Sequence, residues 1–242
     1  MTTLAKIIVA TLISLSLFSC NFDMNINSGV KGSGNVTIEN RTITKPFTAI
    51  KATEGLDVYL TQSNTESISV EADDNLQELI VTEVVDGVLK IHTKQSIGKS
   101  KSKKVMVSFK SVDAIKATSG SDVYSTNTIT ANHLELETTS GSDMTLAVNT
   151  SSINCKSTSG SDLKLSGKTN KLTAEATSGS DIKAAELVAE SSHVKATSGA
   201  DITINTVKEL TASASSGGDI KYKGNPETIN KNESSSGSVK KQ

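Results

Sequence analysis

The pentapeptide Thr118-Ser119-Gly120-Ser121-Asp122 opens a series of near-identical copies that decides the fold of this 242-residue chain. Further copies begin at Thr139, Thr158, Thr177, Thr197 and Ser215. The copy at Thr197 has Ala200 in its fourth place, and the last copy departs further from the repeat and reads Ser-Ser-Gly-Gly-Asp. The glycines of successive copies lie 21, 19, 19, 20 and 18 residues apart. Such a period indicates that one small structural unit is stacked on itself.

Each unit contains a strand before the pentapeptide and another strand after it. The positions five, three and one residues before the first residue of the pentapeptide are apolar or small, whereas the residues between them are mostly polar. These positions hold Leu134, Leu136 and Thr138; Ile153, Cys155 and Ser157; Leu172, Ala174 and Ala176; Ser192, Val194 and Ala196; Leu210, Ala212 and Ala214. Such alternation is typical of a strand with one buried face. The pentapeptide forms a bend in which glycine takes a positive φ, and an apolar residue after each aspartate starts the second strand.

Units of 18–21 residues predict a β-solenoid. The distance from the buried strand to the aspartate is constant, whereas the stretch from the aspartate to the next buried strand varies from 9 to 12 residues. One side of the unit is therefore held in register, and the other tolerates insertions as a loop does. The units are too short for a strand–helix–strand crossover, whereas solenoid turns would pair in parallel about 4.8 Å apart. We therefore expect an all-β fold with regular coils over about residues 112–239.

The first half of the domain follows the same pattern less closely. Thr53-Glu54-Gly55-Leu56-Asp57-Val58 matches the first repeat in its threonine, glycine, aspartate and valine. Asp86-Gly87 lies between two apolar runs and predicts a β-hairpin with a type I′ turn. Residues 75–85 are the only candidate for a helix, and the segment is short. We expect longer, irregular coils and a hairpin here, and a final partial turn at the other end in which Gly237 follows Gly217 and the aspartate is deleted.

The first residues have the pattern of an export signal. Lys6 precedes an apolar run over residues 7–18, which is too short to span a bilayer as a mature helix. The run ends in Leu17-Phe18-Ser19-Cys20, which resembles the bacterial lipobox. The predicted divisions of the chain are a signal peptide (1–19), a lipidated Cys20 with a tether (20–31) and a single domain (32–242). The alternative is an ordinary secretory signal with a chance cysteine.

Composition argues against several classes of partner. Cys155 is the only other cysteine, so the mature chain has no intramolecular disulfide. The net charge is −1 and Arg41 is the only arginine, so there is no basic patch of the kind that binds nucleic acid. Aromatic residues make up 3% of the chain and tryptophan is absent, which argues against a platform for stacking on sugars.

The aspartates of the repeat are the sharpest candidate site. They are Asp122, Asp143, Asp162, Asp181, Asp201 and Asp219. Stacked carboxylates about 4.8 Å apart repel one another, so something must compensate. One interpretation is a ladder that binds a divalent cation such as calcium; the other is that each carboxylate caps amides of its own bend. We favour capping, because each unit offers only one carboxylate and a calcium site needs several oxygens. We therefore expect no cofactor, and calcium on this ladder is the alternative.

No residues suggest catalysis. Cys155 lies in the apolar column of Ile115, Leu136 and Ala174, which predicts an inert thiol in the core. The three histidines, His92, His133 and His193, are scattered over different places in their units, so we predict no metal triad and no Ser-His-Asp set. Ice binding by the threonines is a further alternative, but it needs threonines on a flat strand rather than at a glycine bend.

A family resemblance follows from these motifs. The residues that carry it are Gly32-Ser33-Gly34-Asn35-Val36, the segments 47–60 and 84–91, and the Ser-Gly-Ser-Asp series ending in Gly224-Asn225-Pro226 and Ser236-Gly237-Ser238. Together they resemble the family called putative auto-transporter adhesin, head GIN domain, whose members are largely uncharacterised lipoproteins of Bacteroidota-type bacteria. The resemblance covers about residues 30–242 and implies a right-handed parallel β-helix. It implies no established activity, because the adhesin label is itself inferred from shape.

We expect a lipid-anchored outer-membrane protein of the cell envelope, on the periplasmic side or on the cell surface. No acidic run that would mark surface export follows Cys20. The expected function is non-catalytic, adhesin-like binding of an envelope or extracellular protein or glycan, with the membrane reached through the N-terminal lipid. The alternatives are a structural periplasmic lipoprotein without a specific ligand and a polysaccharide-active β-helix enzyme.

Overall fold

A computed structural model of the chain describes residues 29–242. Its strands are β1 (Val36–Arg41), β2 (Ala49–Ala52), β3 (Asp57–Gln62), β4 (Ser67–Asp73), β5 (Ile80–Val85), β6 (Val88–Thr93), β7 (Lys103–Phe109), β8 (Ala114–Ala117), β9 (Asp122–Ser125), β10 (Ile129–Thr139), β11 (Asp143–Thr158), β12 (Asp162–Thr177), β13 (Asp181–Thr197), β14 (Asp201–Ser215), β15 (Asp219–Lys223), β16 (Thr228–Glu233) and β17 (Ser238–Lys241). One 3₁₀ turn, η1 (Asp74–Leu76), interrupts them. The predicted signal peptide, Cys20 and most of the predicted tether lie outside the described residues.

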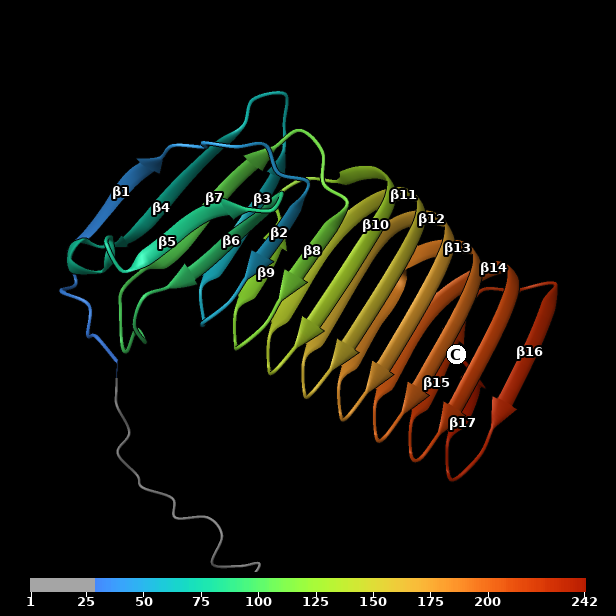
Figure 1. The fold of residues 1–242 in the computed structure, drawn as a ribbon. Coiled ribbons are helices and arrows are strands. Elements are labelled where there is room, and N and C mark those ends of the chain that lie inside the picture. Colours follow the sequence, from blue (N-terminus) through green and yellow to red (C-terminus); the bar gives the residue numbers. More distant parts are fainter. Residues whose placement is uncertain (1–28) are drawn as a thin grey trace, which may run out of the picture.

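The strands form a flattened solenoid with two sheets, which confirms the predicted all-β fold (Figure 1). The near sheet holds β6, β2, β8, the later parts of β10–β14, and β16; the far sheet holds β7, β3, β9, the first parts of β11–β14, β15 and β17. The chain runs down the near sheet and up the far sheet as it advances toward the C-terminus, so the solenoid is right-handed (Figure 1). About seven turns with coils of about 19 residues lie between residues 114 and 241.

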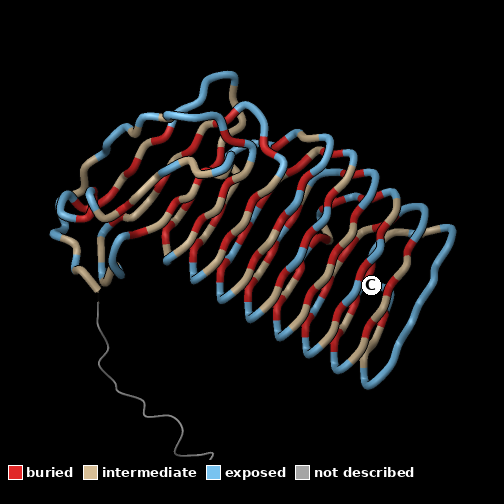
Figure 2. Tube along the Cα trace, in the orientation of Figure 1, coloured by how far each residue is buried: buried red, intermediate tan, exposed pale blue. Residues whose placement is uncertain are grey.

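The core lies between the two sheets, where alternate residues of every coil point inward. Figure 2 shows buried residues alternating with intermediate or exposed ones along the strands. The column of Ile115, Leu136, Cys155, Ala174, Val194 and Ala212 is buried throughout, as the repeat predicted. Next to the bend the inward residues are small, such as Ser157 and Ala176, because the two sheets converge at that corner.

The bend has the same backbone in every coil. Ser119 and Gly120 both have positive φ, +56° and +70°, and every later copy repeats this pair. The serine after the glycine is buried: the Ser121 hydroxyl accepts a hydrogen bond from the Thr118 amide at 3.2 Å and donates to the Thr118 carbonyl at 2.9 Å. Ser142, Ser161 and Ser180 repeat these contacts to their own bends in whole or in part. The cap that was expected from the aspartate is therefore supplied by this inward serine.

In the N-terminal half the coils are stacked out of sequence order. The β2–β3 coil lies between the β6–β7 coil, which follows it in the chain, and the β8–β9 coil. Asp57 pairs with Asp122, and Glu54-Gly55 has the same positive φ values as the later bends, so the match over residues 53–58 is confirmed. The hairpin at Asp86-Gly87 is confirmed as well. The helix candidate is wrong, because β5 occupies most of residues 75–85 and only η1 is helical.

The N-terminal end of the domain is held by a buried carboxylate. Asp73 accepts hydrogen bonds from the amides of Gly34, Lys101 and Ser102 at 2.7–3.0 Å. Burial by itself raises the pKa of this carboxyl, but these amides outweigh burial and hold the pKa below its ordinary value. Gly32 packs so close to Asp73 that a Cβ would overlap the carboxylate. Residues 29–31, which were expected in the tether, also contact the fold, since Val30 bridges to Ile97.

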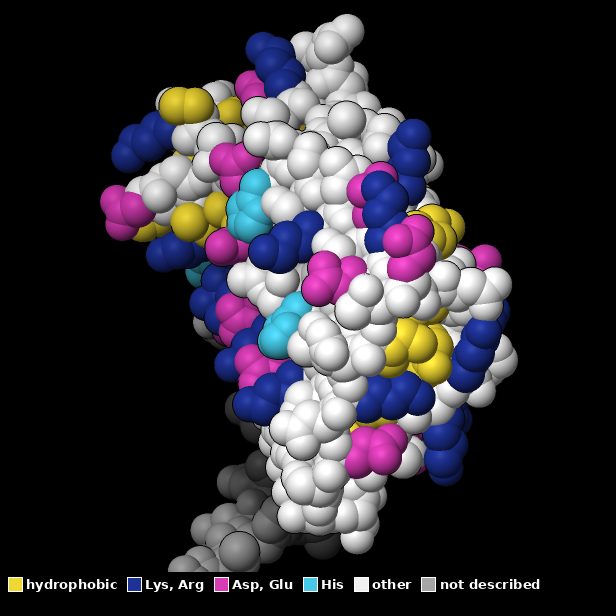
Figure 3. Space-filling view, turned by 90° about the vertical axis from the view of Figure 1, so that its right-hand side faces the viewer, with side chains coloured by type: hydrophobic (Ala, Val, Ile, Leu, Met, Phe, Trp, Pro, Cys, Tyr) yellow, Lys and Arg dark blue, Asp and Glu magenta, His cyan; other side chains and the backbone are white. Residues whose placement is uncertain are grey.

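The C-terminal end is closed by charged side chains. Ser238 pairs with Asp219, so a serine replaces the aspartate that was expected to be deleted, and Ser236 rather than Gly237 takes the place of Gly217. In β16, Lys231 and Glu233 occupy inward positions, opposite Ala212 and Ala214. The Lys231 ammonium donates to the Val239 carbonyl at 3.1 Å, and Glu233 accepts from the Val239 amide at 2.5 Å. Figure 3 faces this end and shows apolar areas broken up by charged and polar side chains.

Candidate binding surface

The six predicted aspartates stand in register along one corner of the far sheet. Each pairs with the next across neighbouring strands, from Asp122 to Asp219. Asp57 of β3 adds a seventh member, which lies on the N-terminal side of Asp122. Lys104 of β7 is the next partner beyond Asp57, and Ser238 ends the series at the other side. The structure therefore brings together all the predicted carboxylates and one more.

Two neighbours relieve part of the repulsion within this aspartate ladder. The Lys183 ammonium lies 2.7 Å from Asp162 and 3.3 Å from Asp181, so it bridges two successive coils. At the last coil, the Ser238 hydroxyl donates to Asp219 at 2.6 Å. These contacts provide a cation and a donor from the protein itself.

Elsewhere in the ladder two carboxyls have raised pKa values, with burial as the larger cause and repulsion as the next. Burial, and then the charges of Asp143 and Asp57, raise the pKa of Asp122 above its ordinary value. Burial, and then Asp181 and Asp219, raise the pKa of Asp201. Within residues 29–242, no group of three or more His, Cys, Asp or Glu side chains is placed to hold a metal ion. Calcium binding by the ladder stays the untested alternative.

The other reactive residues lie apart from one another. Cys155 is a free thiol in the core, and burial raises its pKa to about 12. His92 contacts Glu83 at 3.3 Å, while His133 contacts Ser152 at 2.9 Å on a different coil. His193 lies in β13, further along the near sheet.

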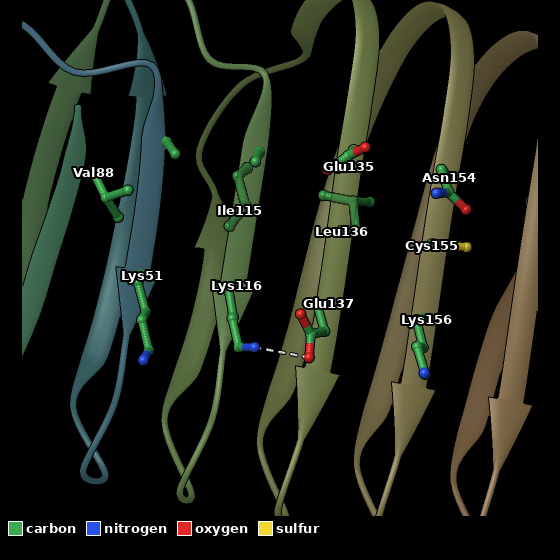
Figure 4. A pocket seen from close by; sticks show the side chains of 12 residues that line it. Lys51, Val88, Ile115, Lys116, Glu135, Leu136, Glu137, Asn154, Cys155 and Lys156 are labelled. Carbon is green, nitrogen blue, oxygen red and sulfur yellow. Dashed lines mark ion pairs between the residues drawn. The ribbon is translucent and has the colours of Figure 1, made fainter. Parts of the chain in front are cut away.

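The near sheet carries a hollow of about 410 Å³ on its outer face, which we call the outer groove. It crosses β6, β2, β8, β10 and β11, where the irregular coils meet the regular ones (Figure 4). Its outward-facing lining consists of Ala49, Lys51, Val88, Ala114, Lys116, Glu135, Glu137, Asn154 and Lys156.

Small side chains make the floor of the groove. Val88, Ala49 and Ala114 are direct partners on three adjacent strands, so they form an unbroken apolar column. The column continues through Glu135 and Asn154, which are longer and polar. The surface is therefore hollow and apolar over β6, β2 and β8, and it rises where the regular coils begin.

A row of charged side chains forms one wall. Lys51, Lys116, Glu137 and Lys156 stand side by side on neighbouring strands in Figure 4. Lys116 forms an ion pair with Glu137 at 2.8 Å. Beyond the groove the row continues with Glu175 and Lys195, which are 3.6 Å apart. Basic and acidic side chains also alternate along the left-hand edge of Figure 3.

Sequence reasoning missed the groove because its parts meet only through the unusual stacking order. Lys51 and Lys116 are 65 positions apart in the chain, yet β2 and β8 are adjacent strands. One signal could have found this pairing: Ala-Ile-Lys-Ala occurs at both Ala49–Ala52 and Ala114–Ala117. Nothing in the sequence places β6 beside them.

A second, more polar hollow of about 580 Å³ lies along the arc where the long strands pass from the far sheet to the near sheet. Its lining includes Thr150, Thr169, Glu190 and the exposed side chains of Val188 and Val207. No helix in the part of the chain that the structure describes is long and apolar enough to cross a membrane.

Comparison with known proteins identifies relatives of the same architecture. The sequence profile of the family described as "Putative auto-transporter adhesin, head GIN domain" matches residues 46–226. A putative adhesin from Bacteroides fragilis has a similar structure with a TM-score of 0.81 and 22% identity, over 88% of this chain and 100% of the other. A putative adhesin from Parabacteroides merdae (21% identity, 88% and 98% coverage) and a putative lipid binding protein from Parabacteroides distasonis (20%, 88% and 99%) both reach a TM-score of 0.70. No curated protein matches the chain. At these identities the solved structures establish the fold alone.

Proposed function

Because this chain belongs to the putative auto-transporter adhesin head GIN domain family, we propose that it is a non-catalytic binding module of the cell envelope, anchored by a lipid on Cys20. The predicted signal peptide and the lipobox-like Leu17-Phe18-Ser19-Cys20 support the anchor. A sequence of this type directs attachment to a membrane, and two or more acyl chains hold firmly because each buried methylene contributes about 0.8 kcal/mol.

The observation that carries the binding role is the outer groove. It combines a hollow, an apolar floor and a wall of charged side chains on an otherwise regular sheet. Ligand sites are typically concave and mostly apolar, with a few polar groups that fix orientation. The corner ladder of aspartates repeats evenly along the solenoid, whereas the groove lies where the irregular coils meet the regular ones.

The arrangement of the ends supports presentation away from a membrane. Val30 joins the fold beside Ile97, at the end of the molecule opposite β16 and β17 (Figure 1). A lipid on Cys20 would therefore hold the N-terminal end near the bilayer, with the solenoid extending from it. The putative lipid binding protein of similar fold is compatible with a ligand on such a scaffold.

Labelling of growing cells with radioactive palmitate tests the anchor. We expect the full-length chain to take up label and to fractionate with membranes, and Cys20→Ala to do neither. Protease treatment of intact cells then separates a surface protein, which is digested, from a periplasmic one, which is protected.

A pulldown from envelope extract with the chain from Asn21 onward tests binding; recovery of no partner or ligand would favour the purely structural alternative. A reducing-end assay on polysaccharides tests the enzyme alternative, which release of sugar would support.

A further inference from the structure

The order of positive and negative side chains in the row on the near sheet changes at the outer groove. From Lys116 onward the signs alternate through Glu137, Lys156, Glu175 and Lys195, all direct partners across parallel strands. Opposite charges on facing positions stabilise a sheet and like charges destabilise it, so alternation is what a purely structural row requires. The solenoid follows that requirement for four successive pairs.

Before Lys116 the alternation stops. Lys90, Lys51 and Lys116 are direct partners on β6, β2 and β8, which places three ammonium groups in succession. Among residues 29–242, Lys51 has neither an ion pair nor a side-chain hydrogen bond, and its two neighbours in the row are both lysines. Lys90 faces Glu83 across the hairpin, but the Glu83 carboxylate lies against His92. The row therefore lacks a negative charge at Lys51.

The apolar floor lies on the same three strands. Beside the three lysines the neighbouring column holds Val88, Ala49 and Ala114. Beside the alternating part of the row, the same column holds Glu135, Asn154, Thr173, His193 and Thr211. An excess of positive charge and a loss of polar side chains thus coincide at one place, and neither is needed by the fold.

We propose that the outer groove binds a small anionic amphiphile, with its charged head at Lys51 and its apolar part on Ala49, Val88 and Ala114. The anion supplies the missing negative charge between Lys90 and Lys116. This proposal deepens the proposed function, on which it rests, by giving the ligand of the binding surface a chemical class. A carboxylate or phosphate on an alkyl chain has both of the required parts.

The remaining lining sets the direction of the ligand. Glu135 lies on β10, two strands beyond Lys51, so it repels the head from that end of the groove. Lys116 is already paired with Glu137, and Lys156 stands between two glutamates in the row, so Lys51 is the lysine of the lining that has no acidic neighbour in the row. The volume of about 410 Å³ lies within the range of small-ligand sites, roughly 300–1,000 Å³. No aromatic side chain lines the groove, which disfavours a sugar ring as the main contact.

Calorimetric titration of the chain from Asn21 onward with decanoate, below its micelle-forming concentration, tests the proposal. We expect one saturable site that weakens with added salt, because the head is held by a charge that solvent and salt ions can reach. Decanol has the chain without the charge and acetate has the charge without the chain, so each should bind at least tenfold more weakly. Decanol or acetate binding as well as decanoate would overturn the assignment of both parts to one ligand.

Two variants remove the two halves of the site separately. Lys51→Glu completes the alternation, so it should abolish decanoate binding while raising the melting midpoint by about 1–3 °C. Ala49→Leu fills the floor and should weaken decanoate at least tenfold with every lysine intact. The matched control is Lys195→Gln, in the same row but outside the groove, which should bind decanoate as the parent does. Binding that survives both groove variants would place the ligand elsewhere and refute the proposal.

A free amphiphile and an anionic lipid headgroup share this chemistry, and vesicles distinguish them. Phosphatidylcholine vesicles with and without phosphatidylglycerol are sedimented with the protein. Binding to the anionic vesicles that Lys51→Glu abolishes assigns a bilayer surface, and decanoate binding alone assigns a free ligand. If neither binds, the ligand class is wrong, although the Cys20 anchor and the envelope location can still stand. Conversely, failure of palmitate labelling would refute the anchor and leave the decanoate result untouched.

Discussion

The two halves of the molecule both consist of stacked coils but build and cap the bends with different residues. In the regular solenoid every bend is built from Ser and Gly, and from Ser121 to Ser180 it is capped by an inward serine. In the irregular half, the matching bend has Glu54 and Leu56 in those places. The Glu54 carboxylate there accepts hydrogen bonds from the amide and hydroxyl of Thr93, on another strand.

This difference extends to the carboxylates. Repetition forces the aspartates of the solenoid to stack on one another, and burial, followed by the charges of the neighbouring carboxylates, raises the pKa values of Asp122 and Asp201. In the irregular half, Asp73 and Asp74 have donors of their own, and their pKa values fall. Repetition thus yields a long surface at the cost of like-charge contacts, whereas irregular stacking gives each charge specific partners and creates the outer groove.

The largest expected effect comes from a cavity placed in each half. Leu60 in β3 and Leu165 in β12 are both fully buried. Leu→Ala at either position should lower the free energy of unfolding by about 2–5 kcal/mol, because transfer energy and packing are both lost. Urea denaturation measures this cost, and hydrogen exchange shows where it falls.

The set of strands in which amide exchange becomes faster should differ between the two variants. Leu165→Ala should speed amide exchange in β11–β13 and leave β2–β7 unchanged, because a solenoid coil touches only its neighbours. Leu60→Ala should speed amide exchange in the coils on both sides of β3, since β3 pairs with β7 and with β9, and both of these strands follow it in the chain. Equal acceleration everywhere in both variants would show that the molecule unfolds as a single unit.

The second effect concerns the cap of the bend. Ser161→Ala leaves the Thr158 amide without the Ser161 acceptor in a buried corner, which should cost about 1–3 kcal/mol. Ala200, buried at the equivalent place in a later coil, provides the matched reverse variant. Ala200→Ser should add about 0.5–1.5 kcal/mol, because the backbone there has the same positive-φ pair. Loss of stability in both variants would mean that volume rather than hydrogen bonding controls the corner.

The sequence was sufficient to predict what repeats. Alternation before each bend identified the buried columns, and Asp86-Gly87 identified the hairpin, because both signals are local. The serine cap was not predicted, since serine and aspartate can each accept from a bend amide and only the direction of the side chain decides. That direction places Ser161 inside the corner and Asp162 outside it.

The order of the N-terminal coils could not be predicted. The placement of β6 and β7 beyond β2 and β3 depends on long-range pairing that leaves no periodic trace in the chain. The candidate site depends on that order, because Lys90 and Lys51 become neighbours only through it. The aspartate ladder was visible because it is periodic, and the outer groove was missed because it interrupts the period.

A third effect, smaller in size, is the opposite pH response of the two halves. The pKa of Asp73 is lowered in the folded state, so its contribution to stability is present above the ordinary value of about 3.9 and is lost as pH falls through the lowered pKa. The pKa values of Asp122 and Asp201 are raised, so their contribution is present below that value and is lost as pH rises through the raised pKa.

Urea denaturation between pH 3 and 7 tests this contrast. At neutral pH, Asp73→Asn should destabilise the protein, and its loss of stability in acid should be shallower than that of the parent. Asp122→Asn should instead stabilise it by roughly half a kcal/mol, after allowance for solvent screening, and should remove part of the decline above pH 4. The exposed Asp113→Asn is the control. A parallel shift of all three curves would contradict the assignment of opposite signs.

The smallest expected effect is that of calcium on the aspartate ladder. Each coil presents one carboxylate, and Lys183 already bridges Asp162 and Asp181, so the oxygens that calcium requires do not converge on that pair. Millimolar calcium should therefore move the melting midpoint by less than about one degree, and a chelator should move it no further. Lys183→Gln sharpens the test, because it frees two adjacent carboxylates and should make any calcium response larger. A rise of several degrees in the melting midpoint of the parent protein would show instead that the ladder binds the cation. Repetition in the solenoid would then create a binding site as well as repulsion between like charges.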